Sequence, residues 1–196
     1  MTEAAHQMAS NPLPPGERRP GTVGRATGIE IVALDERWQP VQPGDEGEVA
    51  VRGPSVVDEY LDNPAATAAA FSGGWFRTGD VGKLSADGYL SLVGRVKELI
   101  NRAGEKISPY EVEDVLLAHP AVAEAAAYPV PDEKYGEQVG VVIVLRGEAT
   151  PRELTAYCAE RLAAFKRPAR VTILPEIPKG PTGKIQRRNL AALVGE

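Results

Sequence analysis

Two four-residue segments, Ser108–Glu111 and Thr150–Glu153, constrain the fold of this chain more than any other feature. Each begins with a hydroxyl residue and a proline and ends with a glutamate. This is the pattern of a capping box, in which both polar side chains satisfy free backbone N–H groups at a helix start. We therefore expect two helices, the first stopping at His119–Pro120 and the second near Ala164. The buried stripe expected on the first helix is Val112, Val115 and Leu116.

Apolar runs around these helices predict three strands of one sheet. Val122–Tyr128 and Val139–Leu145 follow the first helix, and Val171–Leu174 follows the second. The run at 139–145 is nearly all apolar, which is typical of a strand buried on both faces, so we expect it at the centre of the sheet. Residues 97–196 are therefore predicted to form a small α+β domain of about 100 residues, within the usual range for a domain.

Residues 1–96 have a different character. The stretch 1–28 is rich in proline and glycine and predicts extended loop, whereas Gly28–Leu34 and Val49–Val51 predict strands. A short alanine-rich helix is expected from Asn63, and Asp87–Gly88 is a strong signal for a hairpin turn. The predicted fold class is α+β, with a mostly antiparallel β segment followed by the small α+β domain, and with the boundary near Lys97.

Composition excludes several classes of protein. With 43% hydrophobic and 25% charged residues, the chain can bury a core and is not expected to be disordered. The single cysteine, Cys158, excludes an internal disulfide and is expected to face the core. The two histidines, His6 and His119, are too isolated to predict a metal site. Because we find no secretory signal and no long apolar stretch, we expect a cytoplasmic protein without a membrane partner.

The charge is negative overall but unevenly distributed. A net charge of −5 argues against a nucleic-acid partner. In the tail segment from Lys166 to Arg188, however, seven basic residues are opposed by one acidic residue, Glu176. This tail is either a solvated face or a surface that attracts a small polyanion such as a nucleotide or the phosphates of coenzyme A. Its basic residues are Lys166, Arg167, Arg170, Lys179, Lys184, Arg187 and Arg188.

One of these cations, Lys184, lies on a distinctive loop. Pro178–Ile185 contains too much glycine and proline for a helix or strand, and Gly183 lets the backbone come close to a ligand. Such a stiff loop can present one charge to a phosphate or carboxylate, although many exposed loops of this composition have no chemical role. A Walker A loop is excluded because Ile185 follows the lysine where that motif requires serine or threonine.

Four motifs occur in a fixed order along the chain, namely Thr78–Asp80, Gly94–Ile100, Gly104–Glu113 and the Lys184 loop. Together they closely resemble the carboxyl-terminal third of the adenylate-forming enzymes, the family of acyl-CoA synthetases, luciferases and peptide-synthetase adenylation domains. The first residues, Met1–Ala4, resemble the end of that family's Tyr-Gly-Met-Thr-Glu motif. The resemblance extends over essentially the whole chain.

This resemblance implies a function and an organisation. Residues 1–96 would be the end of the large AMP-binding domain, a remnant of its β-barrel part, and 97–196 the family's carboxyl-terminal domain. The chain is expected to be the carboxyl-terminal portion of an AMP-forming acid–CoA ligase that uses ATP, Mg²⁺ and coenzyme A. Because the family's phosphate loop lies upstream of Met1, we expect the chain to be inactive by itself. The alternative is a non-catalytic remnant or interaction domain that retains the fold.

The resemblance also assigns roles to individual residues. Lys184 would be catalytic and bridge carboxylate and phosphate oxygens. Asp80 would accept hydrogen bonds from the ribose hydroxyls of the nucleotide, and Arg95 would reach its ribose or phosphates. Without the resemblance, Asp80 is equally compatible with a simple turn residue and Arg95 with a surface charge. Thr2 matches a residue that contacts the α-phosphate, and Glu3 one that contacts the magnesium ion.

Three further assignments concern domain motion, coenzyme A binding and the acid substrate. Lys97 resembles the hinge about which the small domain rotates, and Gly104 would line the coenzyme A channel, although Ala103 stands where the family often has a second glycine. The opening residues most resemble the oxalyl-CoA synthetase branch, in which a histidine at the position of His6 lies beside the acyl pocket. Ala5 replaces a serine that is common there. A short polar acid, with oxalate as the leading candidate, is therefore expected; the alternative is that His6 is a polar loop residue.

Overall fold

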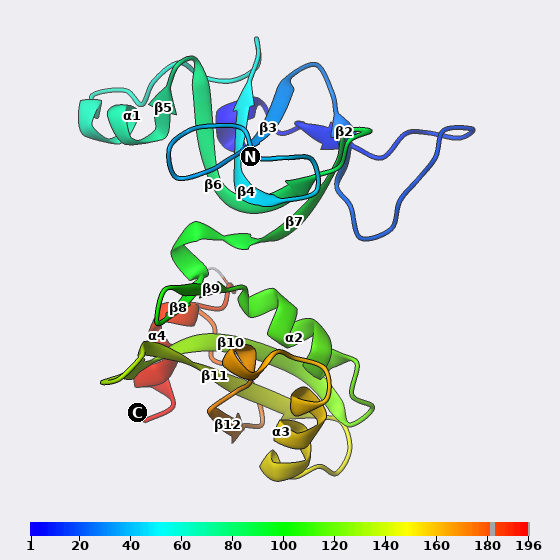
Figure 1. Ribbon diagram of the computed structural model, residues 1–196, viewed down its shortest axis with the longest axis vertical. Helices are drawn as coiled ribbons and strands as arrows, with labels where there is room; N and C mark the ends of the chain where they lie inside the picture. Colours follow the sequence, from blue (N-terminus) through cyan, green and yellow to red (C-terminus); the bar gives the residue numbers. More distant parts are fainter. Residues whose placement is uncertain (181–182, 196) are drawn as a thin grey trace. The chain divides into compact units, whose positions relative to one another are not determined.

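The computed structural model describes residues 1–180 and 183–195, so Pro181 and Thr182 of the predicted Lys184 loop lie outside the described residues. The chain divides into two compact units, Met1–Val96 and Lys97–Glu196, each built around its own sheet (Figure 1). The α+β class predicted from the sequence is confirmed. No helix among the described residues is long and apolar enough to cross a membrane.

Unit 1 is a seven-stranded sheet in which every strand pair is antiparallel. The strand order is β1-β2-β7-β6-β4-β3, with β5 also paired to β6. Each pairing is between strands that a loop or hairpin can join, as antiparallel sheets allow. The elements of this unit are the 3₁₀ helix η1 (Thr2–Ala4), β1 (Ala9–Ser10), β2 (Gly24–Ala26), β3 (Glu30–Leu34), β4 (Glu46–Arg52), α1 (Pro64–Ala70), β5 (Phe71–Ser72), β6 (Trp75–Leu84) and β7 (Tyr89–Arg95).

Most local predictions for this unit are confirmed. The turn at Asp87–Gly88 joins β6 to β7, and Gly88 has a φ of +86° that favours glycine. Helix α1 begins after Asn63, whose side chain accepts a hydrogen bond from the Ala66 amide. The prediction of extended loop for residues 1–28 is wrong in part, because η1, β1 and β2 form there. Strand β1 pairs with β2, which returns the chain to the edge of β7.

Unit 2 contains a five-stranded mixed sheet with the order β10-β11-β8-β9, and β12 pairs in parallel with β11. Strand β11 therefore contacts β10, β8 and β12, which confirms its predicted central position. The elements are β8 (Ile100–Arg102), β9 (Glu105–Ile107), α2 (Pro109–Leu117), β10 (Val122–Asp132), β11 (Gly136–Leu145), α3 (Pro151–Ala159), η3 (Ala164–Lys166), β12 (Arg170–Ile173) and α4 (Arg187–Leu193), while η2 (Val96–Glu98) crosses the boundary between the units.

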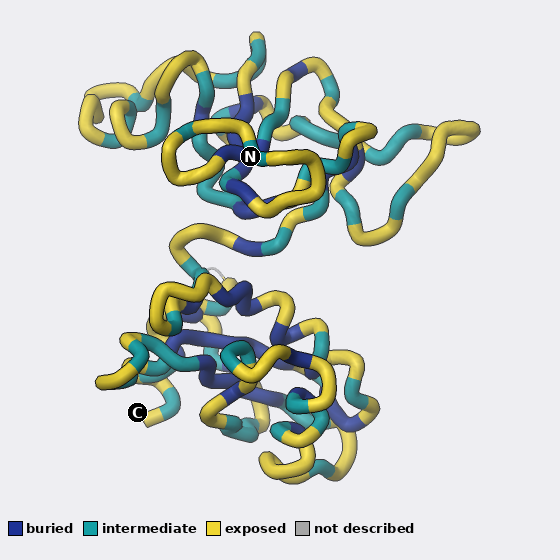
Figure 2. Tube along the Cα trace, in the orientation of Figure 1, coloured by how far each residue is buried: buried dark blue, intermediate teal, exposed yellow. Residues whose placement is uncertain are grey.

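Helices cover both faces of this sheet. On β10, Ala125 and Ala127 pack in the cluster that contains residues of α2 and α3, whereas Ala126 and Tyr128 pack in the cluster that contains Leu190 of α4. Successive side chains of a strand point to opposite faces, so a strand covered on both faces must be apolar throughout. Figure 2 shows β10 and β11 as the continuous buried centre of the unit.

The two predicted capping boxes had different outcomes. At α3 the box forms as expected, because Thr150 Oγ1 accepts from the Glu153 amide at 3.2 Å and Glu153 Oε2 accepts from the Thr150 amide at 2.7 Å. This helix is shorter than predicted and ends at Ala159, after which the chain turns into η3. Cys158 is fully buried in the core as predicted, and burial raises the pKa of its thiol to about 11.

At α2 the prediction of a capping box is wrong. Ser108 is the N-cap residue, but its side chain makes no capping hydrogen bond. The carboxylate of Glu111 instead accepts from Lys166 Nζ at 2.6 and 2.7 Å. A lysine ammonium donates a stronger hydrogen bond to a carboxylate than a neutral backbone amide does. Glu111 therefore binds Lys166 and does not bind the Ser108 amide, as the capping box would require. The helix still ends before His119, with Ala118 as its C-cap residue.

A buried ion pair connects three elements of unit 2. Arg187 Nη2 at the start of α4 donates to Glu113 Oε2 of α2 at 2.9 Å, and both side chains are only 8% exposed. Glu113 Oε1 also accepts from the Ala127 amide of β10 at 2.7 Å. Burial raises the pKa of Glu113 to about 7, against the attraction of Arg187, which lowers it. Neither this pair nor helix α4 was predicted from the sequence.

We expect Arg187→Leu to lower the free energy of unfolding of unit 2 by about 3–5 kcal/mol at pH 8, because an uncompensated buried carboxylate remains. The folded-state pKa of Glu113 lies above its ordinary value, so its ionisation destabilises the fold as pH rises through about 7. Removing Arg187 raises this pKa further, and the deficit should therefore shrink at pH 5. Urea unfolding followed by circular dichroism measures both values.

The control is the double variant Glu113→Gln/Arg187→Leu, which keeps an oxygen acceptor for the Ala127 amide without a charge. It should be more stable at pH 8 than Arg187→Leu alone. A single variant within about 1 kcal/mol of the parent, or a double variant no more stable than the single one, would contradict the assignment.

Candidate nucleotide-binding and ligase site

Two of the predicted nucleotide-binding residues lie side by side in unit 1. Asp80 of β6 and Arg95 of β7 are direct partners in the antiparallel register. Arg95 Nε lies 2.9 Å from Asp80 Oδ1. The Asp80 side chain is 20% exposed and that of Arg95 is 60% exposed, so the pair presents both an acceptor and several donors to solvent. Such a pair can bind a sugar hydroxyl and an anionic oxygen together.

The segment before Asp80 explains how the carboxylate is placed. Thr78 Oγ1 donates to the Val49 carbonyl of β4 at 2.8 Å and accepts from the Asp80 amide at 3.1 Å. Gly79 between them has a φ of +74°, in the left-handed region that favours glycine. The Thr-Gly-Asp segment is therefore fixed to the neighbouring strand on one side of Asp80 and to Arg95 on the other.

Glu3, the predicted magnesium residue, is tied to an aromatic cluster. Its backbone carbonyl accepts from the Val57 amide at 2.9 Å, and its Oε1 accepts from the Tyr60 hydroxyl at 3.1 Å. Burial, together with the nearby carboxylate of Glu3, raises the pKa of Tyr60. The Tyr60 ring in turn packs edge-on against the Phe71 ring, with 6.0 Å between the ring centroids. Thr2 lies beside Glu3 in η1 and is exposed.

The donor set at Glu3 fits a magnesium ion only in part. Among residues 1–180 and 183–195, no three His, Cys, Asp or Glu side chains gather into a metal-binding group. Glu3 offers a single carboxylate, of which one oxygen bonds Tyr60. Magnesium is commonly held by one or two carboxylates together with substrate phosphates and water. Glu3 fits that arrangement if phosphate oxygens supply the remaining ligands.

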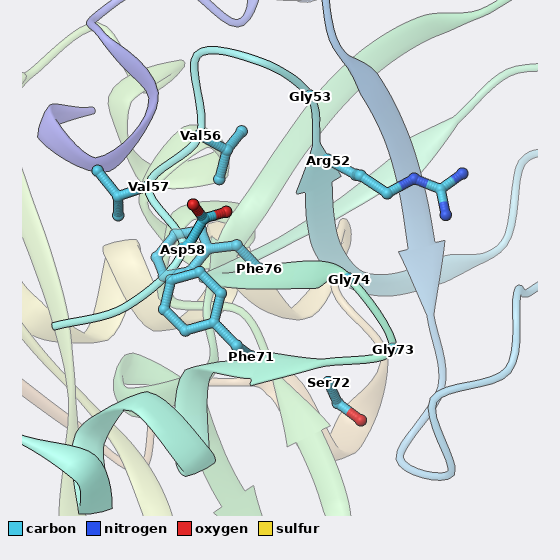
Figure 3. Close-up of a pocket in the computed structure, with 10 residues that line it drawn as sticks. All are labelled: Arg52, Gly53, Val56, Val57, Asp58, Phe71, Ser72, Gly73, Gly74 and Phe76. Carbon is cyan, nitrogen blue, oxygen red and sulfur yellow. The ribbon is translucent and has the colours of Figure 1, made fainter.

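A pocket of about 380 Å³ lies beside this cluster (Figure 3). Val56, Val57 and Asp58 line it from the loop after β4, and Phe71 and Phe76 line it from β5 and β6. In Figure 3 the Asp58 carboxylate lies near the two phenyl rings, while Arg52 points away from them. None of the residues predicted to bind substrate lines this pocket in the part of the chain that the structure describes.

His6, the predicted acyl-pocket residue, is exposed. Its amide donates to the Met1 carbonyl at 3.0 Å, and its carbonyl accepts from the amino terminus at 3.3 Å. Ala5 and His6 have φ values of +47° and +73°. Two consecutive left-handed residues other than glycine are unusual and carry strain. The structure thus fixes the backbone at His6 and leaves its imidazole accessible.

In unit 2, Lys184 is exposed beside a short, anchored turn. The Gly180 amide donates to the Lys184 carbonyl at 2.9 Å, and Lys179 and Ile185 form an isolated antiparallel bridge. Ile177 and Ile185, before and after the turn, pack against the cluster around Leu190. The described part of the predicted loop therefore has a rigid base, and the Lys184 side chain extends from it into solvent.

The two remaining predicted residues also belong to unit 2. Lys97 lies in η2 at the junction, and its carbonyl accepts from Arg188 Nε at 3.0 Å. Gly104 occupies the turn between β8 and β9 with a φ of +93°, and its amide donates to Asn101 Oδ1 at 3.1 Å. The residue before it, Ala103, has a φ of +51°. The turn conformation is sufficient reason for glycine at position 104.

The chain matches two protein-family models and is similar to curated proteins over nearly its whole length. The model of the AMP-binding enzyme C-terminal domain matches residues 111–184, and the AMP-binding enzyme model matches residues 1–61. The oxalate–CoA ligase of Arabidopsis thaliana is 52% identical over 194 residues, which cover 97% of this chain and 38% of the relative. The oxalate–CoA ligase of Saccharomyces cerevisiae is 49% identical over 195 residues, which cover 97% of this chain and 36% of the relative.

A solved structure gives the same result for the fold. The o-succinylbenzoate coenzyme A synthetase of Bacillus subtilis, in complex with ATP and a magnesium ion, aligns with a TM-score of 0.82 at 36% sequence identity. The alignment covers 95% of this chain and 39% of that structure. The chain thus spans less than two-fifths of the length of the relatives that it matches.

The turn at Gly104 allows a matched pair of substitutions. Gly104→Ala should destabilise unit 2 by about 1–2 kcal/mol, since a side chain is unfavourable at this φ. Ala103→Gly should be neutral or stabilising, because it removes a side chain from the same left-handed region. Thermal unfolding of both variants measures the difference. Equal stability of the two variants would contradict the importance of the turn conformation.

Proposed function

The chain belongs to the AMP-binding enzyme family, and we propose that it supplies the carboxyl-terminal part of an AMP-forming acid–CoA ligase. The observation that carries this proposal is the Asp80–Arg95 pair of unit 1, which occurs in one chain with the exposed Lys184 beside its anchored turn in unit 2. These are the residues that the reaction requires to bind a nucleotide and to neutralise its phosphate.

The proposed reaction has two steps. First, a carboxylate oxygen of the acid attacks the α-phosphorus of ATP, and pyrophosphate leaves with the bonding electrons. Second, the coenzyme A thiol loses its proton, its sulfur attacks the acyl carbon, and AMP leaves. Lys184 acts in the first step, where its ammonium group bridges the approaching carboxylate and phosphate oxygens and reduces their mutual repulsion. Asp80 accepts hydrogen bonds from the ribose hydroxyls, and Arg95 donates to the ribose or phosphates.

The other predicted residues take supporting roles in this proposal. Thr2 contacts the α-phosphate. Glu3 would help to hold magnesium through its carboxylate, and the ion would neutralise phosphate charge. Lys97 at the junction of the units is the hinge, where a change in φ and ψ exchanges the Lys184 turn for the Gly104 turn at the reacting centre. Gly104 then borders the coenzyme A channel.

The substrate class follows from the residues near the amino terminus. A short dicarboxylate carries a second charge that must be paired or hydrogen-bonded when it is buried, and the exposed imidazole of His6 can do this. The Arabidopsis and yeast relatives, at 52% and 49% identity, are oxalate–CoA ligases. We propose oxalate as the acid that the ligase activates.

A chimera can test the role of Lys184. This chain would replace the matching residues of the Arabidopsis oxalate–CoA ligase, and ATP–pyrophosphate exchange would be measured with oxalate. The unsubstituted chimera should be active, whereas residues 1–196 alone should not catalyse exchange. Lys184→Ala should reduce exchange on the order of a hundredfold or more, since it removes a charge that stabilises the transition state.

The same variant should still form the thioester from preformed acyl-adenylate, because Lys184 acts only in the first step. The matched control is Lys179→Ala, on the other side of the turn. Lys179 Nζ lies 3.4 Å from Glu124 Oε2, and its removal should leave exchange unchanged. An inactive unsubstituted chimera would support the non-catalytic alternative. Equal loss of both half-reactions in Lys184→Ala would contradict the proposed role.

A second prediction concerns the acid. The chimera should prefer oxalate over acetate and hexanoate, and His6→Ala should lower kcat/KM for oxalate about tenfold while leaving that for acetate unchanged, because only oxalate carries the second carboxylate. Steady-state kinetics with the three acids measures this. A preference for hexanoate would overturn the oxalate assignment, and an identical profile in His6→Ala would exclude His6 from the pocket.

A further inference from the structure

Arg188 makes three contacts at the junction-proximal end of unit 2. It lies in the first turn of α4, four residues after Lys184. Its Nε donates to the Lys97 carbonyl at 3.0 Å, and its Nη2 donates to the Leu99 carbonyl at 2.9 Å. Its Nη1 donates to Glu137 Oε1 at 2.5 Å. All three nitrogens of one planar group are therefore engaged, and two of them hold the backbone that immediately follows the junction.

The partner carboxylate of Arg188 is itself fixed. Glu137 belongs to β11, the central strand, and its Oε2 accepts from the Asn101 amide of β8 at 2.7 Å. The Arg188 side chain is 47% exposed and that of Glu137 is 25% exposed, so the ion pair contributes little energy by itself. Its value is geometric, because a guanidinium with five donors in one plane can hold two carbonyls and a carboxylate at once.

The side chain of Glu98, between the two bound carbonyls, is also held by unit 2. Its Oε2 accepts from the Tyr110 hydroxyl at 3.2 Å and lies 3.4 Å from Arg187 Nε. Arg187 is in turn buried against Glu113. The neighbouring arginines at the start of α4 thus reach the carbonyls of Lys97 and Leu99 and the side chain of Glu98.

We propose that Arg188 is a positioning residue that locks residues 97–99 to helix α4. The same helix packs against Ile185, the residue after Lys184, through the cluster around Leu190, so α4 connects residues 97–99 with the chain directly after Lys184. Rotation is then confined to the bonds before the Lys97 carbonyl. The catalytic significance of this lock rests on the proposed ligase function, whereas the lock itself does not.

Hydrogen exchange of the 196-residue chain, followed by mass spectrometry, tests the lock directly. In Arg188→Gln, amides in residues 98–101 should exchange about tenfold faster. The segment can then open without breaking the hydrogen bonds from Arg188 to the Lys97 and Leu99 carbonyls. Arg188→Lys should be intermediate, because an ammonium keeps the charge near Glu137 but lacks the planar fork. Arg161→Gln, which removes an exposed arginine paired with Glu160, is the matched control and should not change this segment.

Amides of β10 and β11 report on the integrity of the fold and should stay as protected as in the parent. Unchanged exchange at 98–101 in Arg188→Gln would overturn the lock. Faster exchange throughout unit 2 would overturn it as well, since Arg188 would then serve general stability.

The chimera with the Arabidopsis ligase tests the consequence for catalysis. Arg188→Gln should lower kcat about tenfold and leave KM for ATP within about twofold, because Arg188 orients Lys184 without touching substrate. Arg188→Lys should recover part of kcat. An unchanged kcat, or a raised KM with unchanged kcat, would overturn the positioning role. An inactive unsubstituted chimera would instead refute the proposed function, while hydrogen exchange would still decide whether the lock exists.

Discussion

The buried pair of Glu113 and Arg187 is the interaction on which unit 2 depends. A carboxylate and a guanidinium that are almost fully removed from water stabilise each other here, and the Ala127 amide donates a second hydrogen bond to the Glu113 carboxylate. The pair joins helix α2, strand β10 and the first turn of α4. Because α4 follows the Lys184 turn directly, fixing Arg187 also fixes Arg188 and the base of that turn. The position of the proposed catalytic lysine thus rests on an ion pair at a distance from it.

Local signals in the sequence predicted much of the fold. The Thr150–Glu153 capping box and the Asp87–Gly88 turn depend only on neighbouring residues, and both form as expected. The Ser108–Glu111 box failed because Lys166, distant in the sequence, binds the glutamate instead. Helix α4 was not predicted because its charged start, Arg187–Arg188, resembles a solvated basic tail. Only Arg187 of the two is buried, where it pairs with Glu113. Partners distant in sequence decided each of these failures.

In the candidate site, too, the sequence predicts individual residues but not the contacts between residues distant in sequence. The motif order identified Asp80 and Arg95 separately, and the strand register brings them together as a cross-strand pair. The sequence could not show that Arg188 binds the Lys97 and Leu99 carbonyls, because nothing in residue type distinguishes this arginine from an exposed one. The roles of all these site residues remain predictions, and each has a defined structural setting from which it can be tested. They are Thr2, Glu3, His6, Asp80, Arg95, Lys97, Gly104 and Lys184.

In the proposed ligase, the acid's carboxylate bonds to the α-phosphorus of ATP. Isotope transfer tests this most directly. The chimera would be supplied with oxalate labelled in its carboxylate oxygens, together with ATP and coenzyme A, and the products would be analysed by mass spectrometry. The account predicts one labelled oxygen in each AMP, since the attacking oxygen stays on phosphorus when the thiol displaces AMP. Label in inorganic phosphate with ADP as co-product, or AMP without label, would contradict it.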